Sequence, residues 1–298
     1  MFDSVSVWIW AIVVLNLAVA VAAICALRYL SGLLFGVDSR NELAEKDNFA
    51  FGVTLAGGAV AVALVLAAAT AGDPAVDFAQ ELGVVSLYAV LGLVLLKVGM
   101  AINDWVVFNE FSLKQAINGG NVAAGAAQAA NLIAIGLLVN AAIDYSEGGL
   151  ATAVASVVIV FLLAQIVLLG VTRMRGFIYA KRNDGAKWQA AIESGNTALA
   201  VRYTGHLVGT ALAVSSAGGM IVYVVPPDAG MVVVYAALLG LAVVLAGVLL
   251  LLSMLAQRVI LHGIDVVQEV DVQANIGVAA IEASVFIGVG LVMHAVIG

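Results

Sequence analysis

Long stretches of apolar residues without charges alternate with short polar segments along this chain. A helix needs about 20 apolar residues to cross a hydrocarbon core about 30 Å thick, so stretches of this length predict membrane-spanning helices. The sequence contains eight of them, at approximately 5–26, 48–71, 82–96, 121–143, 150–171, 196–222, 231–255 and 275–297. The pattern therefore predicts an all-α polytopic membrane protein with about eight transmembrane helices.

The second, fourth, sixth and eighth runs each open with an asparagine that is followed by small residues. These asparagines are Asn48, Asn121, Asn196 and Asn275. They lie roughly 75 residues apart, and a regular period of this size indicates repeated structural units. Each predicted unit consists of an odd-numbered helix, a loop and an even-numbered helix. Two units make a four-helix half, so we expect two membrane domains, residues 1–146 and 147–298.

Small residues dominate the even-numbered runs. In the sixth run they recur at four-residue spacing, and Gly205 and Gly209 form a GxxxG pair. Such a stripe lets two helices approach closely in a membrane. The odd-numbered runs are rich in Leu and Val, which suit contact with lipid. We therefore expect an inner layer of even-numbered helices that the odd-numbered helices surround.

Composition supports a membrane protein and restricts the chemistry. Of the 298 residues, 64% are hydrophobic and only 10% are charged, and the mean hydropathy is +1.13. Such a chain is typical of proteins that have lipid as their solvent. The single cysteine, Cys25, cannot form an intrachain disulfide, and the sequence offers no Cys/His ligand set for zinc or an iron–sulfur cluster. We expect no cofactor and no metal.

Charged residues are segregated between the two sets of loops. The loops after odd-numbered helices, with the adjoining helix ends, carry the basic residues Arg28, Arg40, Lys46, Lys97, Lys114, Arg173, Arg175, Lys181, Arg182, Lys187 and Arg258. The loops after even-numbered helices carry only acidic charges, at Asp73, Asp77, Glu81, Asp144, Glu147 and Asp228. The positive-inside rule then places the basic loops in the cytoplasm and both termini outside.

Two of the repeated segments resemble a known family. The stretches EKDNFAFG at 45–52 and ESGNTA at 193–198 place an acidic residue a few positions before the asparagine. This pattern resembles the YjfL-like bacterial inner-membrane proteins, the domain-of-unknown-function family 350, whose members have a four-helix domain. The resemblance covers essentially the whole chain and implies two tandem copies. The fourth unit departs from the pattern, because Val272 stands where the acidic residue is expected.

The four asparagines admit two interpretations. Asparagine is among the best N-caps, because its side-chain oxygen accepts hydrogen bonds from the free N–H groups of a helix's first turn. Repeated units would naturally repeat their caps. Alternatively, four helix N-termini around a shared axis would form a vestibule whose amides and dipoles could handle ions. A structure decides between them by showing whether the asparagines converge.

Charges inside the apolar runs are the most informative polar groups, because they are costly in a membrane. Arg202 is the sixth residue after Asn196, and Glu282 is the seventh after Asn275. At 1.5 Å per residue, both lie about 10 Å inside their helices and could form an ion pair. His206 shares the helix face of Arg202, and Gln128 and Asn131 occupy corresponding regions of the first half. These residues form either a structural ion pair with polar contacts between helices, or an intramembrane polar site that water, an ion or a proton can reach.

Two classes of function remain open. No set of nucleophile and base, metal cluster or phosphate-binding loop indicates an enzyme, and no nucleic-acid partner is expected. The intramembrane charges favour a channel or transporter for a small ion, either a cation or a proton, with Glu282 as its ligand. The alternative, which the family resemblance implies, is a non-conducting scaffold in envelope-stress physiology that docks a cytoplasmic PspA-like partner. Lipid is the expected surrounding in both cases, and a homo-oligomer stays open.

Overall fold

The structure is a computed structural model that describes residues 3–34, 36–71, 77–146 and 149–298, and these residues are almost entirely helical. Within them, eight helices are long and apolar enough to cross a membrane. They are Val7–Tyr29, Phe49–Ala69, Phe78–Val107, Val122–Asp144, Leu150–Arg182, Thr197–Val224, Met231–Ile260 and Ile276–Ile297. The prediction of an all-α protein with eight membrane helices is confirmed.

The elements follow one another in the order of the predicted repeat. They are α1 (Asp3–Leu34), η1 (Asn41–Glu45), α2 (Phe49–Ala69), α3 (Phe78–Ile102), η2 (Asn103–Val107), α4 (Leu113–Asn118), α5 (Val122–Asp144), α6 (Leu150–Arg182), α7 (Trp188–Glu193), α8 (Thr197–Ser215), α9 (Ala217–Val224), α10 (Met231–Ile260), η3 (Gln268–Val272) and α11 (Ile276–Ile297). The η elements are short π-helical turns.

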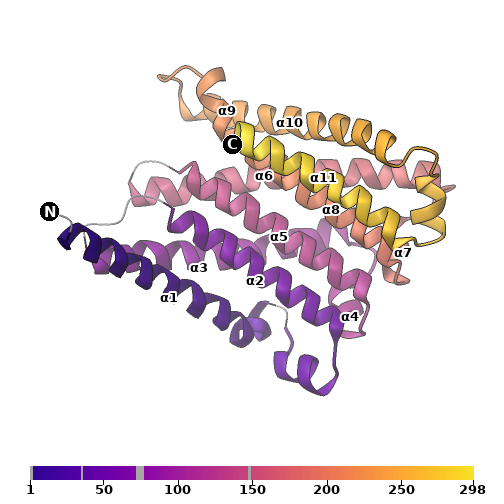
Figure 1. Ribbon diagram of the computed structural model, residues 1–298, viewed down its shortest axis with the longest axis horizontal. Coiled ribbons are helices and arrows are strands. Elements are labelled where there is room, and N and C mark those ends of the chain that lie inside the picture. The colour runs from indigo at the N-terminus through magenta and orange to yellow at the C-terminus, as the bar shows by residue number, and fades with distance from the viewer. Residues whose placement is uncertain (1–2, 35, 72–76, 147–148) are drawn as a thin grey trace.

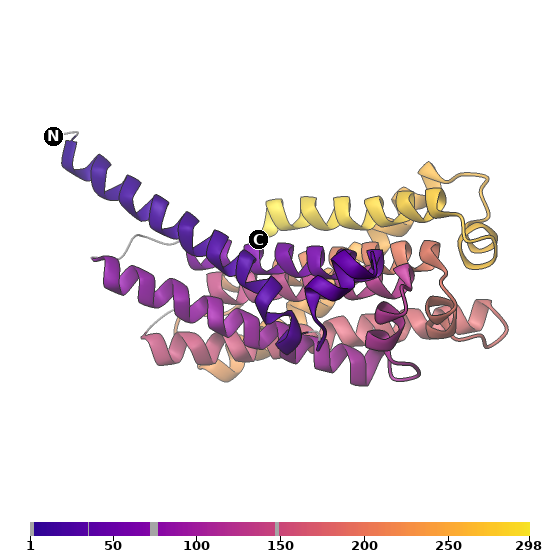
Figure 2. The same cartoon turned by 90° about the horizontal axis from the view of Figure 1, so that it is seen from below.

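The four helices that begin at the asparagines, which are α2, α5, α8 and α11, form a row. Helix α2 packs on α5, α5 packs on α8, and α8 packs on α11 (Figure 1). The other long helices lie against this row: α3 contacts α2 and α5, α6 contacts α5 and α8, and α10 contacts α8 and α11. Figure 2 shows α3 and α6 on one side of the row, with α1 slanting away at its N-terminal end. The expected surrounding shell is therefore a second layer on one face of the row.

Small residues allow the helices of the row to touch backbone to backbone. A Cβ atom added to Gly57 would overlap Ala129, and one added to Gly205 would overlap Ala283. In both pairs the glycine is the ninth residue after its capping asparagine, and the alanine is the eighth residue after the capping asparagine of the next unit. Because these α2–α5 and α8–α11 contacts match position by position, the two halves pack in the same way.

The helix starts repeat in atomic detail. Each asparagine is an N-cap: its side chain accepts from the N–H of Phe51, Ala124, Leu199 or Val278, three residues further along, at 2.9–3.3 Å. The residue before each cap has a left-handed backbone, with φ between 48° and 92°. These residues are Asp47, Gly120, Gly195 and Ala274. The capping interpretation therefore holds for all four asparagines.

The turns before the caps fall into two types. In the second and third units a short α-helix, α4 or α7, precedes the asparagine. In the first and fourth units a π-helical turn precedes it, and the asparagine amide donates to a carboxylate six residues earlier. Asn48 donates to Glu42 at 2.8 Å, and Asn275 donates to Glu269 at 2.7 Å. The hydrogen bond from Lys46 lowers the pKa of the buried Glu42 carboxyl, against the effect of its burial. The fourth unit does carry an acidic residue, Glu269, although Val272 occupies the position at which we expected one.

Four predicted helix ends need correction, because α1, α6, α10 and the third span all continue beyond their apolar runs, α6 and the third span the furthest. Helix α6 extends to Arg182, so Arg175 lies inside a transmembrane helix and not in a loop. The third span extends to Val107 and includes Lys97 and Asp104. Two of the acidic loop residues, Asp73 and Glu147, lie outside the described residues.

The sixth predicted run is broken after Ser215, where α8 ends and α9 begins. Serine hydroxyls that bond back to helix carbonyls often bend helices, and Ser215 and Ser216 both donate to the Leu212 carbonyl. The sixth span therefore consists of two helices, and only α8 belongs to the row.

The close contact between α8 and α11 makes a testable prediction. Gly205→Val would place side-chain atoms against the backbone of α11, and we expect a loss of at least about 1–3 kcal/mol of stability in a detergent melt. Gly288→Val on α11 is the matched control, because an added Cβ meets nothing within 4 Å there. Equal losses from the two variants would contradict the packing of the row.

Candidate functional site

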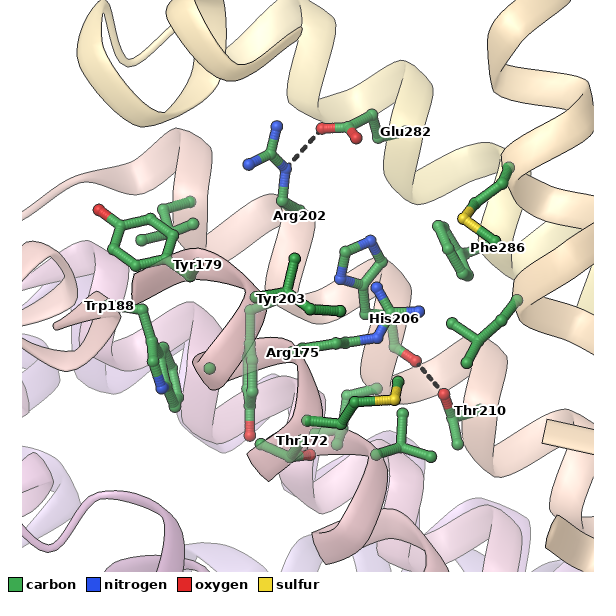
Figure 3. Close-up of a pocket in the computed structure, with 18 of the residues that line it drawn as sticks. Thr172, Arg175, Tyr179, Trp188, Arg202, Tyr203, His206, Thr210, Glu282 and Phe286 are labelled. Atoms are coloured by element: carbon green, nitrogen blue, oxygen red, sulfur yellow. Dashed lines mark hydrogen bonds and ion pairs between the residues drawn. The ribbon is translucent and has the colours of Figure 1, made fainter. Parts of the chain in front are cut away.

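A cavity of about 200 Å³ lies in the second half, between α6, α8, α10 and α11. Its residues lie in the first turns of α8 and α11 and in the last turns of α6 and α10. The cavity therefore lies toward the end of the bundle that carries α4 and α7 (Figure 1). Figure 3 shows the side chains that face it. Most of the wall is apolar, and its polar members include Arg175, Arg182, Arg202, His206 and Glu282.

Arg202 and Glu282 form an ion pair in this cavity. The Arg202 Nε donates to a Glu282 carboxylate oxygen at 2.6 Å, and both side chains are almost fully buried. The Nη2 of Arg202 donates to the Val266 carbonyl at 3.0 Å, and its Nη1 pairs with Asp271. The guanidinium therefore has partners on three sides, which is what a buried charge in a membrane requires.

Asp271 is the centre of a network that the sequence did not reveal. Its side chain is fully buried in η3, where it accepts from Arg202, from Arg182 at 3.1 Å and from Asn183 at 3.0 Å. The network ties η3 to the ends of α6 and α8. A comparison of the four units would have singled out this residue. The position four residues before the capping asparagine holds Asp271 in the fourth unit and an apolar residue, Ala44, Ile117 or Ile192, in the others.

Arg175 enters the same cavity from α6. Its guanidinium carbon lies 4.5 Å from the centre of the Phe286 ring, and the His206 ring packs on the same phenylalanine at 4.3 Å. The Arg175 Nε and Nη2 atoms are buried and have no hydrogen-bond partner among the described residues. The cavity thus contains a partly buried cation with two buried donors that have no hydrogen-bond partner in the described part of the chain.

Aromatic rings close the cavity toward the first half. The Trp188 and Tyr203 rings are stacked with their centres 5.2 Å apart, and Phe108 packs edge-on against both. Phe108 follows η2 in the first half, whereas Trp188 and Tyr203 belong to α7 and α8. Gln189 strengthens this junction by donating to the Val107 carbonyl at 2.6 Å. The two halves therefore meet directly beside the site.

The first half contains an equivalent cavity of about 280 Å³. The third and sixth residues after the capping asparagine line both cavities: Phe51 and Thr54 here, and Leu199 and Arg202 in the second half. The seventh residue of the next even-numbered helix also lines both. It is Gln128 in the first half and Glu282 in the second. The neutral pair Thr54 and Gln128 thus occupies the place of the ion pair.

Gln128 and Asn131 lie in the first half, as their register requires, and not in the cavity of Arg202. Gln128 accepts from Asn103 at 3.4 Å. Asn131 lines a small cavity between the halves together with Gln165 and Tyr203, and each of these three has a buried polar atom without a partner among the described residues. The predicted polar site is therefore divided between separate places, with Arg202, Glu282 and His206 in one of them.

The four capping asparagines do not surround one axis. They follow the row of helices, and three of them also reach the turn of the next unit. Asn48 donates to the Ile117 carbonyl at 2.9 Å, Asn121 to Ile192 at 3.1 Å, and Asn196 to Val270 at 3.4 Å. The vestibule interpretation is wrong, because successive helix starts lie side by side and use their amides for links between units. Among the described residues, no group of three His, Cys, Asp or Glu side chains could hold a metal ion.

The fold and the repeated caps define a multi-pass membrane protein built from helix pairs. The model of the family described as Domain of Unknown Function (DUF350) matches residues 4–143, 77–185 and 157–297, and the chain belongs to this family. The first and last matches correspond to the two halves. The middle match starts at the second helix pair, and a chain that repeats one helix pair explains this shift. No curated protein and no solved structure matches the chain.

The ion pair can be tested by a double-mutant cycle. Arg202→Met leaves Glu282 buried without its partner and should cost about 3–5 kcal/mol. Glu282→Leu is the other single variant, and the double variant removes both charges and should cost less than the sum of the two single losses. Thermal melts in detergent measure both effects. Strictly additive losses in the cycle would show that the two residues do not interact.

Proposed function

We propose that this protein handles a small ion in the membrane, and that the cavity at Arg202 and Glu282 is its site. The supporting observation is that buried charged groups line a cavity about 10 Å along the even-numbered helices. Charged side chains at such depth are costly and usually mark pathways for ions or substrates. A scaffold that only docks a partner through its loops has no use for them.

The first half supports the same proposal. Its equivalent cavity is lined by Asp104, whose buried Oδ1 has no hydrogen-bond partner among the described residues, and by Lys97 and Lys114. Asp104 lies in η2, a π-helical turn within a transmembrane span, and such turns are frequent at functional sites. Each half thus offers a cavity that is lined by charged side chains, and in the first half these include the partly buried Asp104.

The role first assigned to Glu282 needs refinement. A carboxylate that already pairs with Arg202 is a poor ligand for a metal cation, because binding would require the ion pair to break. Proton transfer is the form of cation handling that the pair still permits, and His206 lines the same cavity. We therefore place the proton ahead of a metal cation.

The proposed topology puts the protein in a bacterial inner membrane with both termini in the periplasm. The basic loops that contain α4 and α7 lie at one end of the bundle, and the two chain ends lie toward the other (Figure 1). The positive-inside rule assigns the basic end to the cytoplasm. The cavities then lie on the cytoplasmic side of the bilayer.

Cysteine labelling tests this topology. In a Cys25→Ala background, Asp228→Cys lies in the loop after α9 and should react with an impermeant thiol reagent from outside the cell. Asp184→Cys, in the loop after α6, should react only after the membrane is opened. The reverse pattern would overturn the topology.

Ion flux through reconstituted protein tests the function. Glu282→Gln keeps the shape of the side chain and removes its charge, so we expect proteoliposomes with this variant to lose most of the proton or monovalent-ion flux that the parent shows. Glu193→Gln is the matched control, because Glu193 is exposed at the end of α7 and does not line the cavity; it should keep full flux.

Two results would count against the proposal. Equal flux from Glu282→Gln and the parent would remove Glu282 from the mechanism. No flux from the parent across protons and common monovalent ions would favour the scaffold with a cytoplasmic PspA-like partner.

A further inference from the structure

Arg175 is the cavity charge that the network around Asp271 leaves aside. Asp271 pairs with Arg182 and Arg202, and Glu282 pairs with Arg202. The three arginines of the cavity wall therefore share two carboxylates, and the ion pairs of the described residues include none to Arg175. Its contact with the Phe286 ring compensates only part of the cost of burying a guanidinium. An anion is the ligand that would complete the site.

The position of Arg175 in the repeat indicates that this charge is not needed for the fold. Arg175 lies at the same distance before its capping asparagine as Leu27, Met100 and Met254 do in the other three units. Leu27 and Met100 are buried apolar residues at their equivalent places. Three units thus build this helix with an apolar side chain, and only the third places a cation there.

The cavity opens at the side of the bundle, between α6 and α10. Met174, Ile178 and Met254 line it and are still 41–49% exposed, so they form an apolar rim at the outer surface of the bundle. Deeper in, Leu207 and Phe286 extend the apolar wall. A ligand that enters here meets an apolar surface first and the guanidinium behind it.

We propose that this cavity binds an amphiphile with an oxyanion group, a phosphate or a carboxylate, whose charged end pairs with Arg175 and whose apolar chain lies along Ile178 and Met254. The free Nε and Nη2 of Arg175 are two adjacent donors, the arrangement that binds two oxygens of one oxyanion. The apolar rim distinguishes an amphiphile from a free inorganic ion. This inference does not depend on ion transport.

The test compares three probes on purified protein in neutral detergent. The probes are short-chain phosphatidic acid, short-chain phosphatidylcholine and inorganic phosphate. A ligand that binds only the folded protein raises its melting temperature. We expect phosphatidic acid to raise the midpoint of the parent by several degrees and to bind at least about tenfold more tightly than phosphatidylcholine, whereas phosphate alone gives no shift.

Variants at Arg175 link the binding to this residue. Arg175→Leu and Arg175→Met install the side chains that the other units use, so both should fold and melt no lower than the parent without ligand, and both should lose the shift with phosphatidic acid. Arg175→Lys keeps the charge and should retain part of it. Arg258→Leu is the control: this arginine is exposed on α10 outside the cavity, and the shift should be unchanged.

Each contrary result overturns a defined part of the proposal. An undiminished shift in Arg175→Leu and Arg175→Met would show that the lipid binds elsewhere. Equal shifts with inorganic phosphate would make the cavity a site for a free anion, and equal shifts with phosphatidylcholine would show that charge plays no part. Lower melting of both apolar variants without ligand would make Arg175 a structural residue.

Discussion

The hydrogen bonds of the capping asparagines hold the architecture together. Each oxygen caps its own helix, while the amide of Asn48, Asn121 and Asn196 reaches a backbone carbonyl in the turn of the next unit. Because one side chain caps its own helix and binds the turn of the next unit, it fixes the relative position of two units. The row of helices α2, α5, α8 and α11 follows from this link. The glycines along the row then allow the backbones to approach.

Repetition of one helix pair leaves equivalent places in which chemistry can differ. The two cavities use the same positions, yet one places Thr54 beside Gln128 and the other pairs Arg202 with Glu282. The ion pair also needs Asp271, which stabilises Arg202 from the turn before α11. The carboxylates of Glu282 and Asp271 stabilise the Arg202 charge, because a buried ion without partners is strongly destabilising. The first half carries neutral side chains at the two positions of the ion pair.

Much of the fold could be predicted from apolar length and from the period of the asparagines, because bilayer thickness and cap chemistry act locally along the chain. The pairing of Arg202 with Glu282 followed from their matching depths. The roles of Arg175 and Asp271 did not, because the apolar run that predicts the fifth span ends at 171 and leaves Arg175 outside it. A comparison of equivalent positions would have found both residues. The arrangement of the caps in a row depends on packing between units, which no local pattern encodes.

The charged groups with unused hydrogen-bonding atoms differ in sign between the two cavities, and this difference connects the two proposals. In the second half these atoms belong to a cation, Arg175, and in the first half to a carboxylate, Asp104. Each would gain a direct partner from an opposite charge or, for the carboxylate, from a proton. An oxyanion held at Arg175 would balance the charge of the second cavity, and the apolar chain of the ligand would cover the rim. The second cavity would then hold its ligand at Arg175 and keep Glu282, paired with Arg202, as the group at which the ion is proposed to act.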